Sequence, residues 1–192
     1  MIEIPDVSSA RAAILVEGDS DRLAVEALAR RRGRDLEGDG VVVVPMGGSK
    51  NINRFLDRYG PVGLDLGLAG LCDAGEEGDF RRALERADLG RDLTRAGMER
   101  LGFFVCKDDL EDELIRALGP EAVEDVLADL GALDPFRTFQ KQPQWHDRPV
   151  EEQLRRFIGT ASGRKALAAP LLVDALALDR VPRPLDGVLA HV

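Results

Sequence analysis

Four short apolar runs alternate with amphipathic segments over the first 118 residues of the chain. The runs span residues 12–16, 41–44, 66–72 and 102–106. Continuous apolar runs of this length are typical of strands that are buried on both faces of a sheet. Apolar residues then recur at helical spacing in the segments 20–32, 50–59, 80–87 and 110–118. This alternation predicts an α/β fold, with a four-stranded parallel sheet of the Rossmann-like kind and flanking helices.

The pattern becomes purely helical beyond Gly119 and Pro120. The predicted helices there span residues 121–130, 150–158 and 163–176, and the proline-rich stretch 181–185 is predicted to be a terminal loop. We therefore expect an α/β domain over residues 1–119 and a helical extension over residues 120–192. For the first helix, we expect Asp19 or Ser20 as the N-cap and Gly33 as the stop signal.

Composition and charge exclude several classes of protein. The apolar fraction of 44% is too high for a disordered chain, and no apolar run is long enough to span a bilayer. With no signal peptide recognisable at the start, we expect a cytoplasmic protein without a membrane partner. The net charge of −9 argues against sequence-blind binding to nucleic acid, which needs a basic surface. Cys72 and Cys106 lie within apolar strands and are expected to be buried structural thiols.

Acidic residues follow three of the four predicted strands. Glu17 and Asp21 follow the first, Asp73 follows the third, and the segment 108–113 follows the fourth. In a parallel sheet the carboxyl ends of the strands share one edge, so these carboxylates are expected to lie close together. Crowded carboxylates either take up protons or share a cation, and hard oxygen ligands suit Mg²⁺ or Mn²⁺. The alternative is that Asp21 and Asp108 only cap helices.

Two other segments are candidates for phosphate or nucleic-acid contact. The turn formed by Gly47, Gly48, Ser49 and Lys50 opens a helix and offers backbone N–H groups and an ammonium to a phosphate, although it is not a Walker loop. A plain tight turn explains it equally well. Residues 134–165 contain seven Arg or Lys against four Asp or Glu, with interleaved aromatic residues that would suit a bound strand.

Taken in order, these motifs resemble a known family. An apolar strand leading into Glu-Gly-Asp-Ser-Asp (17–21), a later strand ending at Asp73, and Asp-Leu-Glu-Asp-Glu-Leu (109–114) resemble the Toprim domain. The resemblance is to the Toprim nuclease part of the overcoming-lysogenization-defect (OLD) family over residues 11–118, and residues 162–176 resemble its C-terminal helix with a functional lysine.

The resemblance implies roles for individual residues. Glu17 would be a metal ligand and a catalytic acid or base, and Lys165 would be catalytic by stabilising phosphate charge. The further implied metal ligands are Asp21, Asp73, Glu111 and Asp112. The second aspartate of the family's Asp-x-Asp pair is replaced by Gly75, and Glu76 or Glu77 could compensate. The family also carries an ATPase domain, which we do not find in these 192 residues.

The leading hypothesis is therefore a Mg²⁺- or Mn²⁺-dependent nuclease, or a related phosphoryl-transfer enzyme, that acts on DNA or RNA. A second hypothesis is a non-catalytic binding or regulatory module that keeps the fold, motivated by Gly75 and the acidic surface. A third is a receiver-like signalling domain with Asp73 as phosphoacceptor and Lys107 at a later strand end. Further hypotheses concern the partners: a separate ATPase, which the family resemblance suggests, and a second copy of the chain in a homodimer.

Overall fold

The computed structural model describes residues 7, 10–161 and 163–192 of the chain. The predicted α/β domain over residues 1–119 and the segment 162–176 that resembles the family's C-terminal helix therefore fall partly outside the described residues. Four strands form one parallel sheet in the order β2-β1-β3-β4, which confirms the predicted fold class. The strands are β1 (Ala12–Val16), β2 (Val41–Pro45), β3 (Gly67–Cys72) and β4 (Phe103–Val105).

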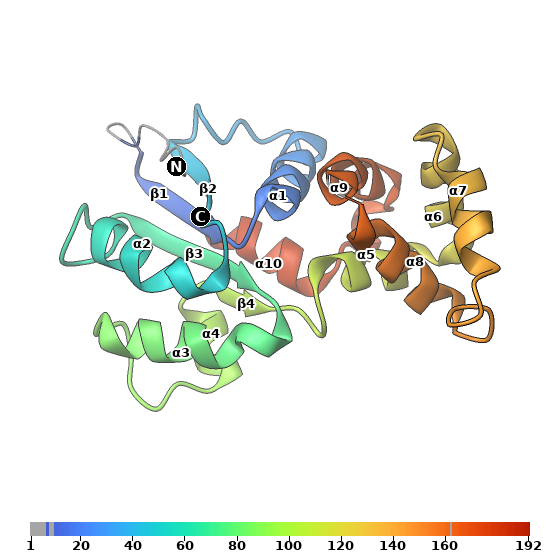
Figure 1. Ribbon diagram of the computed structural model, residues 1–192. Helices are drawn as coiled ribbons and strands as arrows, with labels where there is room; N and C mark the ends of the chain where they lie inside the picture. Colours follow the sequence, from blue (N-terminus) through green and yellow to red (C-terminus); the bar gives the residue numbers. More distant parts are fainter. Residues whose placement is uncertain (1–6, 8–9, 162) are drawn as a thin grey trace.

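The helices cover both faces of the sheet (Figure 1). The N-terminal helices are α1 (Asp19–Arg31), α2 (Ile52–Tyr59), α3 (Glu77–Arg86), α4 (Arg95–Arg100) and α5 (Leu110–Leu118). The later ones are α6 (Pro120–Asp129), α7 (Leu133–Gln140), α8 (Val150–Thr160), α9 (Arg164–Ala175) and α10 (Arg183–His191). Helices α2, α3 and α4 lie on one face, and α1 and α10 lie on the other.

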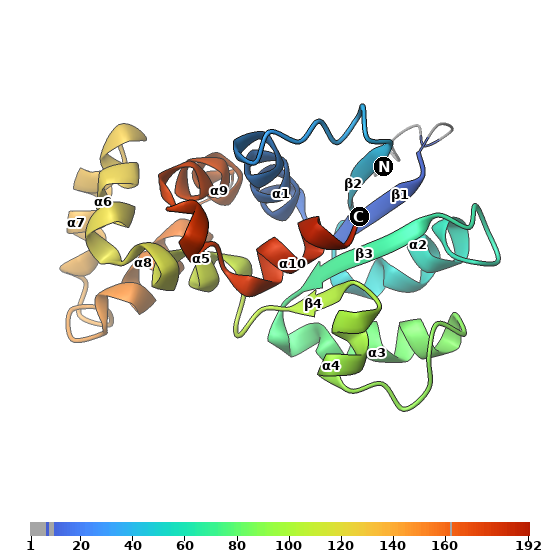
Figure 2. The same cartoon turned by 180° about the vertical axis from the view of Figure 1, so that it is seen from behind.

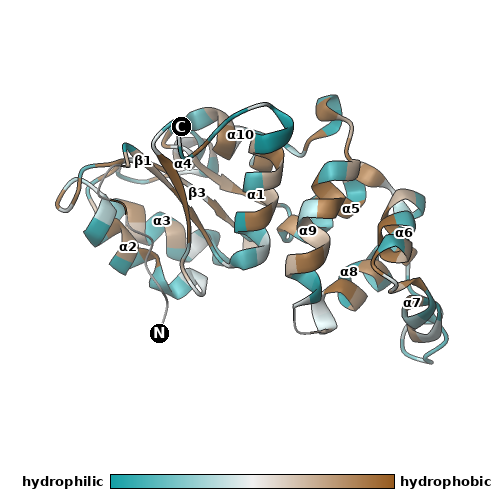
Figure 3. Cartoon of the chain, turned by 90° about the horizontal axis from the view of Figure 1, so that it is seen from above, coloured by the Kyte–Doolittle hydropathy of each residue, from teal (hydrophilic) through white to brown (hydrophobic). Residues whose placement is uncertain are grey.

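The alternation of side chains along β1 divides the core between the two faces. Ala12, Ile14 and Val16 belong to a buried cluster with residues of α1 and α10, whereas Ala13 and Leu15 belong to a cluster with α2 and α3. Both sets are apolar because both faces are covered, as the continuous apolar run predicted. Figure 3 shows the same arrangement, with hydrophobic strands at the centre and polar surfaces turned outward on the helices.

Helices α5 to α9 form a group beside the sheet, seen most clearly from behind in Figure 2. Helix α9 packs along α1, and α5 lies against α8 and α9. Buried residues of these helices, such as Leu172 and Phe157, belong to the same cluster as the α1 side of the sheet. The core therefore continues from the sheet into the helices after residue 119, and the division of the chain at residue 119 stays a prediction.

The predicted terminal loop at 181–185 is wrong, because helix α10 begins at Arg183. Prolines are tolerated in the first helical turn, where their missing N–H would have no helical partner. Leu185, Val188 and Leu189 are buried on one face of α10. Gly187 allows the close approach to β4, since a Cβ there would lie 2.3 Å from the ring of Phe104.

The helix ends also differ in detail from the predictions. The N-cap of α1 is Gly18, not Asp19 or Ser20, because the helix already begins at Asp19. Gly33 follows its end with a φ of 70°, as its role as a stop signal requires. The sequence pattern missed two short helices, α4 and α7, which have too few turns for a clear apolar period. Cys72 and Cys106 are free and buried, as predicted.

Candidate metal centre

Three carboxylates meet at the carboxyl edge of the sheet. Glu17 directly follows β1, Asp73 directly follows β3, and Glu76 ends the 3₁₀ turn Ala74–Glu76 that leads into α3. Each offers one oxygen atom, and these oxygens all lie within 4.8 Å of one another. Sequence reasoning named Glu17 and Asp73 for this place and left Glu76 and Glu77 as alternatives. The structure brings Glu76 into the group.

The neighbouring Glu77 points elsewhere. Its carboxylate binds Arg95 of α4 at 2.5 Å, which leaves Glu76 as the acid of this turn that faces Glu17. Consecutive residues of a helical turn point in different directions, so only one of the two adjacent glutamates reaches the strand ends. The Oε2 atom of Glu76 is buried and has no hydrogen-bond partner among the described residues.

The crowding of these acids disfavours their charged forms. Burial, followed by the adjacent Glu76, raises the pKa of Glu17 from 4.5 to about 7. Burial, followed by the charge of Asp21, raises the pKa of Asp73 from 3.8 to about 8. Without a cation, both groups therefore retain protons well above the pH at which a free carboxyl ionises. A bound divalent cation would favour the charged forms instead.

Asp21 lies one helical turn beyond Glu17. Its carboxylate accepts a hydrogen bond of 2.9 Å from the Gly18 N–H, so it ties the first turn of α1 to the end of β1. Burial nevertheless raises the pKa of Asp21 from 3.8 to about 6, with Glu111 as a further raising charge. The charge of Asp21 therefore interacts both with the carboxylate trio and with the acids at the start of α5.

A partly buried ion pair joins α5 to α9 at the border of the centre. The Nζ atom of Lys165 lies 2.9 Å from Oε2 of Glu111, whose side chain is only 5% exposed. Burial lowers the pKa of Lys165, but the charge of Glu111 and its hydrogen bond outweigh it, so the net shift is upward. Lys165 therefore remains a cation, and its charge lowers the pKa of both Glu17 and Asp21.

The other acid predicted on α5 is placed differently. Asp112 pairs with Arg116 of its own helix at 2.7 Å and does not join the trio of Glu17, Asp73 and Glu76. The N-cap of α5 is Asp109, not Asp108, and it accepts a hydrogen bond of 2.8 Å from the Asp112 N–H. The second carboxylate oxygen of Asp109 accepts from Arg155 of α8, also at 2.8 Å.

Sequence reasoning gave no individual role to Asp109 or Arg155. Asp109 lies next to the centre, because its charge raises the pKa of Asp73 and of Asp21. Arg155 is bonded to Asp109 and therefore borders the same centre. The signal for Asp109 was available, since an aspartate directly before the first residue of an amphipathic segment is a good N-cap. The partner Arg155 had no such signal, because it lies 46 residues away in the sequence.

The glycine turn after β2 lies beside the centre. Gly47 and Gly48 have φ values of 69° and 116°, which other residues rarely adopt. The Gly48 N–H donates to the Glu17 carbonyl at 3.1 Å, and the Asn51 amide bonds the Met46 carbonyl at 2.9 Å. The turn therefore holds the backbone of Glu17. Phosphate binding by Gly47, Gly48, Ser49 and Lys50 stays a prediction.

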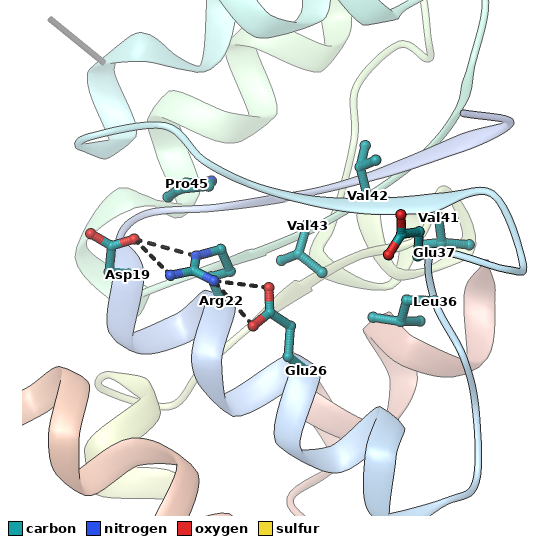
Figure 4. A pocket seen from close by; sticks show the side chains of 9 residues that line it. All are labelled: Asp19, Arg22, Glu26, Leu36, Glu37, Val41, Val42, Val43 and Pro45. Atoms are coloured by element: carbon teal, nitrogen blue, oxygen red, sulfur yellow. Dashed lines mark hydrogen bonds and ion pairs between the residues drawn. The ribbon is translucent and has the colours of Figure 1, made fainter. Parts of the chain in front are cut away.

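Two clefts lie on this part of the surface. One of about 720 Å³ is lined by residues of α5, α8 and α9 that include Asp109, Arg155 and Lys165. The other, of about 540 Å³, lies between α1 and the edge strand β2. In the second cleft Arg22 is bonded to Asp19 and Glu26 (Figure 4). No residue of the carboxylate trio lines either cleft. The first cleft borders the trio, because the charge of its Lys165 lowers the pKa of Glu17 and the charge of its Asp109 raises the pKa of Asp73.

The donor atoms fit a hard divalent cation. Three carboxylates supply only oxygen ligands, which Mg²⁺ and Mn²⁺ prefer. The buried oxygen of Glu76 without a partner is costly unless a cation or a proton satisfies it. These residues, with Asp21 nearby, would hold the metal.

This combination of a β2-β1-β3-β4 parallel sheet with acids after the first and third strands defines a Toprim-type α/β protein. Residues 10–67 match the family described as the overcoming lysogenization defect protein-like TOPRIM domain. This match confirms the resemblance to an OLD-like Toprim domain that was drawn from the sequence. Toprim domains bind divalent metals through acidic residues, in agreement with the carboxylate trio.

Solved structures extend the match along the chain. The C-terminal region of the OLD protein of Xanthomonas campestris pv. campestris is 26% identical with a TM-score of 0.74, over 98% of this chain and 94% of that one. The C-terminal region of the Burkholderia pseudomallei OLD protein has the same fold, with 22% identity, a TM-score of 0.73, and coverage of 95% and 96%. The comparison with curated proteins gives no match. None of the helices within the described ranges combines the length and apolar character needed to cross a bilayer.

Proposed function

We propose that the protein is a Mg²⁺- or Mn²⁺-dependent nuclease that hydrolyses phosphodiester bonds at the carboxyl edge of its sheet. The observation that carries this proposal is the convergence of Glu17, Asp73 and Glu76, whose oxygens lie within 4.8 Å of one another. The OLD-like Toprim match supports nucleic acid as the substrate. The third hypothesis, a receiver-like phosphoacceptor, is not supported by this match.

The residues divide into two groups by charge. Glu17, Asp73 and Glu76 would hold the metal, which when bound polarises a phosphate and stabilises the leaving oxygen. Lys165 lines the adjacent cleft and offers a positive charge to a phosphate oxygen. Glu111 holds Lys165 in place through the 2.9 Å ion pair, and Asp21 adds negative charge next to the metal ligands.

The test is a calorimetric titration with Mg²⁺ and Mn²⁺ together with a nuclease assay on the same samples. Glu17→Gln and Asp73→Asn each remove one charge from the trio with little change in shape. We expect both variants to lose metal binding and cleavage while their circular dichroism stays that of the wild type. Full cleavage by either variant would overturn the proposal. Lys165→Gln is expected to keep metal binding and lose most cleavage.

A second candidate function, a non-catalytic binding module, is favoured by one observation. The family's second aspartate is Gly75 here, so one expected ligand is missing. A Cβ at Gly75 would meet no atom within 4 Å, so the backbone there accepts a side chain. If the centre is active with Glu76 in that role, Gly75→Asp should leave cleavage within a few-fold of wild type. Cleavage that appears only in Gly75→Asp would favour the non-catalytic candidate for the natural chain.

A further inference from the structure

The 720 Å³ cleft beside the candidate metal centre contains the only tryptophan of the chain. Trp145 lines it together with Arg155, Arg156 and Lys165. Its volume falls within the range of roughly 300–1,000 Å³ that is common for small-ligand sites. Lys165 belongs both to this cleft and to the ion pair with Glu111, so the cleft opens next to the proposed reaction centre.

The loop that carries Trp145 is held in place by a buried amide. Gln153 of α8 is 5% exposed, and its amide N–H groups donate to the carbonyls of Trp145 and Arg148, both at 2.8 Å. The Gln140 amide donates to Gln153 in turn at 2.7 Å. This arrangement fixes both ends of the 140–148 loop. The position of Trp145 is therefore set before any ligand binds.

The indole ring is held from behind by other aromatic rings. Its centroid lies 5.2 Å from that of Phe139 with an angle of 28° between the planes, and Phe139 packs on Phe157 at 5.6 Å. Phe157 is buried in the core. Trp145 is thus a rigid aromatic surface at the wall of a cleft, a geometry that favours stacking because little side-chain freedom is lost on binding.

The charges of the cleft are arranged for a phosphate chain. Five acidic residues line it with three basic ones, and four of the acids are in ion pairs: Asp109 and Asp108 with Arg155 at 2.7 and 4.0 Å, Asp112 with Arg116 at 2.7 Å, and Glu152 with Arg148 at 3.7 Å. Arg156 lines the cleft with no hydrogen bond or ion pair to another described residue. Lys165 is paired with Glu111, but its side chain is 42% exposed and brings a second positive charge to the cleft. An unpaired positive charge on Arg156 next to an aromatic platform is the combination that binds single-stranded nucleic acid.

We propose that this cleft binds an unpaired nucleotide of the substrate, with the base stacked on Trp145 and its phosphates near Arg156 and Lys165. This inference rests on the proposed function and specifies its substrate: a strand with unpaired bases, such as a single strand, a flap or a gap. In an intact duplex, the base faces are covered by neighbouring base pairs and cannot reach the indole. Stacking tolerates any base, so we expect little sequence preference.

Because Trp145 is the only tryptophan, fluorescence excited selectively at tryptophan, and not at Tyr59, reports on this site alone. The experiment titrates the metal-free protein with a single-stranded oligonucleotide, the corresponding duplex and an abasic oligomer of equal length. We expect saturable quenching by the single strand and much weaker quenching by the duplex and the abasic oligomer. Equal quenching by the duplex or by the abasic oligomer would overturn the inference.

Binding measured by the anisotropy of a labelled single strand provides the second readout. Trp145→Ala is expected to weaken binding about tenfold or more, whereas Trp145→Phe, which keeps a ring, should lose only a few-fold. Lys141→Ala removes an exposed charge of the same loop that does not line the cleft, and serves as the matched control. Wild-type affinity in Trp145→Ala would overturn the inference. Absence of metal-dependent cleavage by the wild type would instead contradict the proposed function. Failure of the stacking inference and failure of the nuclease proposal are therefore distinguishable.

Discussion

The ammonium of Lys165 lies 2.9 Å from the carboxylate of Glu111, and this bond joins α9 to α5 across 54 residues of sequence. Glu111 is almost fully buried, whereas the Lys165 side chain is 42% exposed. The pair thus consists of a buried acid and a cation, its only ion-pair partner among the described residues, that extends outward into the cleft. Its position makes Lys165 both a structural partner and a candidate for phosphate contact.

We predict that Lys165→Ala destabilises the fold by about 1–3 kcal/mol, because the buried carboxylate of Glu111 loses its charged partner. Lys165→Arg should keep most of the stability, since it keeps a cation within reach. Urea unfolding measures both. The control, Lys141→Ala, removes an exposed lysine and should change the free energy of unfolding by less than about 0.5 kcal/mol. A Lys165→Ala variant as stable as this control would contradict the prediction.

Glu76→Gln and Glu77→Gln form a matched pair of neighbouring substitutions. Glu76 lies in the trio with Glu17 and Asp73, whereas Glu77 is bound to Arg95. We expect Glu76→Gln to weaken Mg²⁺ binding about tenfold or more, since affinity at oxygen sites follows the number of charged ligands. Glu77→Gln should stay within about twofold of wild type. Calorimetry compares them, and equal affinities in the two variants would show that Glu76 is not a ligand.

The stability of the metal-free protein should fall as the pH rises from about 4 to 8. In this range the folded protein still holds protons on Asp73 and Glu17, with pKa values of about 8 and about 7, that the unfolded chain has released. Because the folded state binds more protons, the free energy of unfolding decreases with pH until these groups ionise, and below about pH 4 the contribution is constant.

Thermal unfolding at pH 5 and pH 8 in a chelator tests this dependence. We expect the difference in midpoint between the two pH values to shrink in Asp73→Asn, which cannot ionise, and to shrink when Mg²⁺ takes the place of the protons at pH 8. A midpoint that rises over the same range, with Asp73→Asn behaving as the wild type, would argue against the raised pKa values.

Gly187→Ala should destabilise the protein by about 1–3 kcal/mol, because the added Cβ would lie 2.3 Å from the Phe104 ring and push α10 away from β4. Gly159→Ala is the matched control within another helix. Its Cβ would meet only the Lys165 side chain at 3.6 Å, an ordinary contact, so we expect a gain of about 0.5–1 kcal/mol from helix propensity. Chemical denaturation of both variants measures the contrast. Equal effects would mean that α10 does not depend on this close approach.

The sequence by itself determined the four strands, most of the long helices and the parallel topology. These follow from local rules, because a buried strand must be apolar on both faces and an amphipathic helix must repeat its apolar positions. The acids after β1 and β3 were also predictable, since topology alone brings the ends of parallel strands to one edge. Glu17 and Asp73 were named on that basis, and they lie together in the structure.

Only the tertiary structure decided which side chains complete the site. Glu76 and Glu77 are alike in sequence, and their directions depend on how the turn after β3 meets α4. Asp109 and Arg155 meet through packing of α8 against α5. The sequence pattern predicted a proline-rich loop where α10 begins. The segment is a helix because its apolar face packs against the sheet. Contacts between residues far apart in the chain carry no local pattern, since they depend on the positions of whole elements.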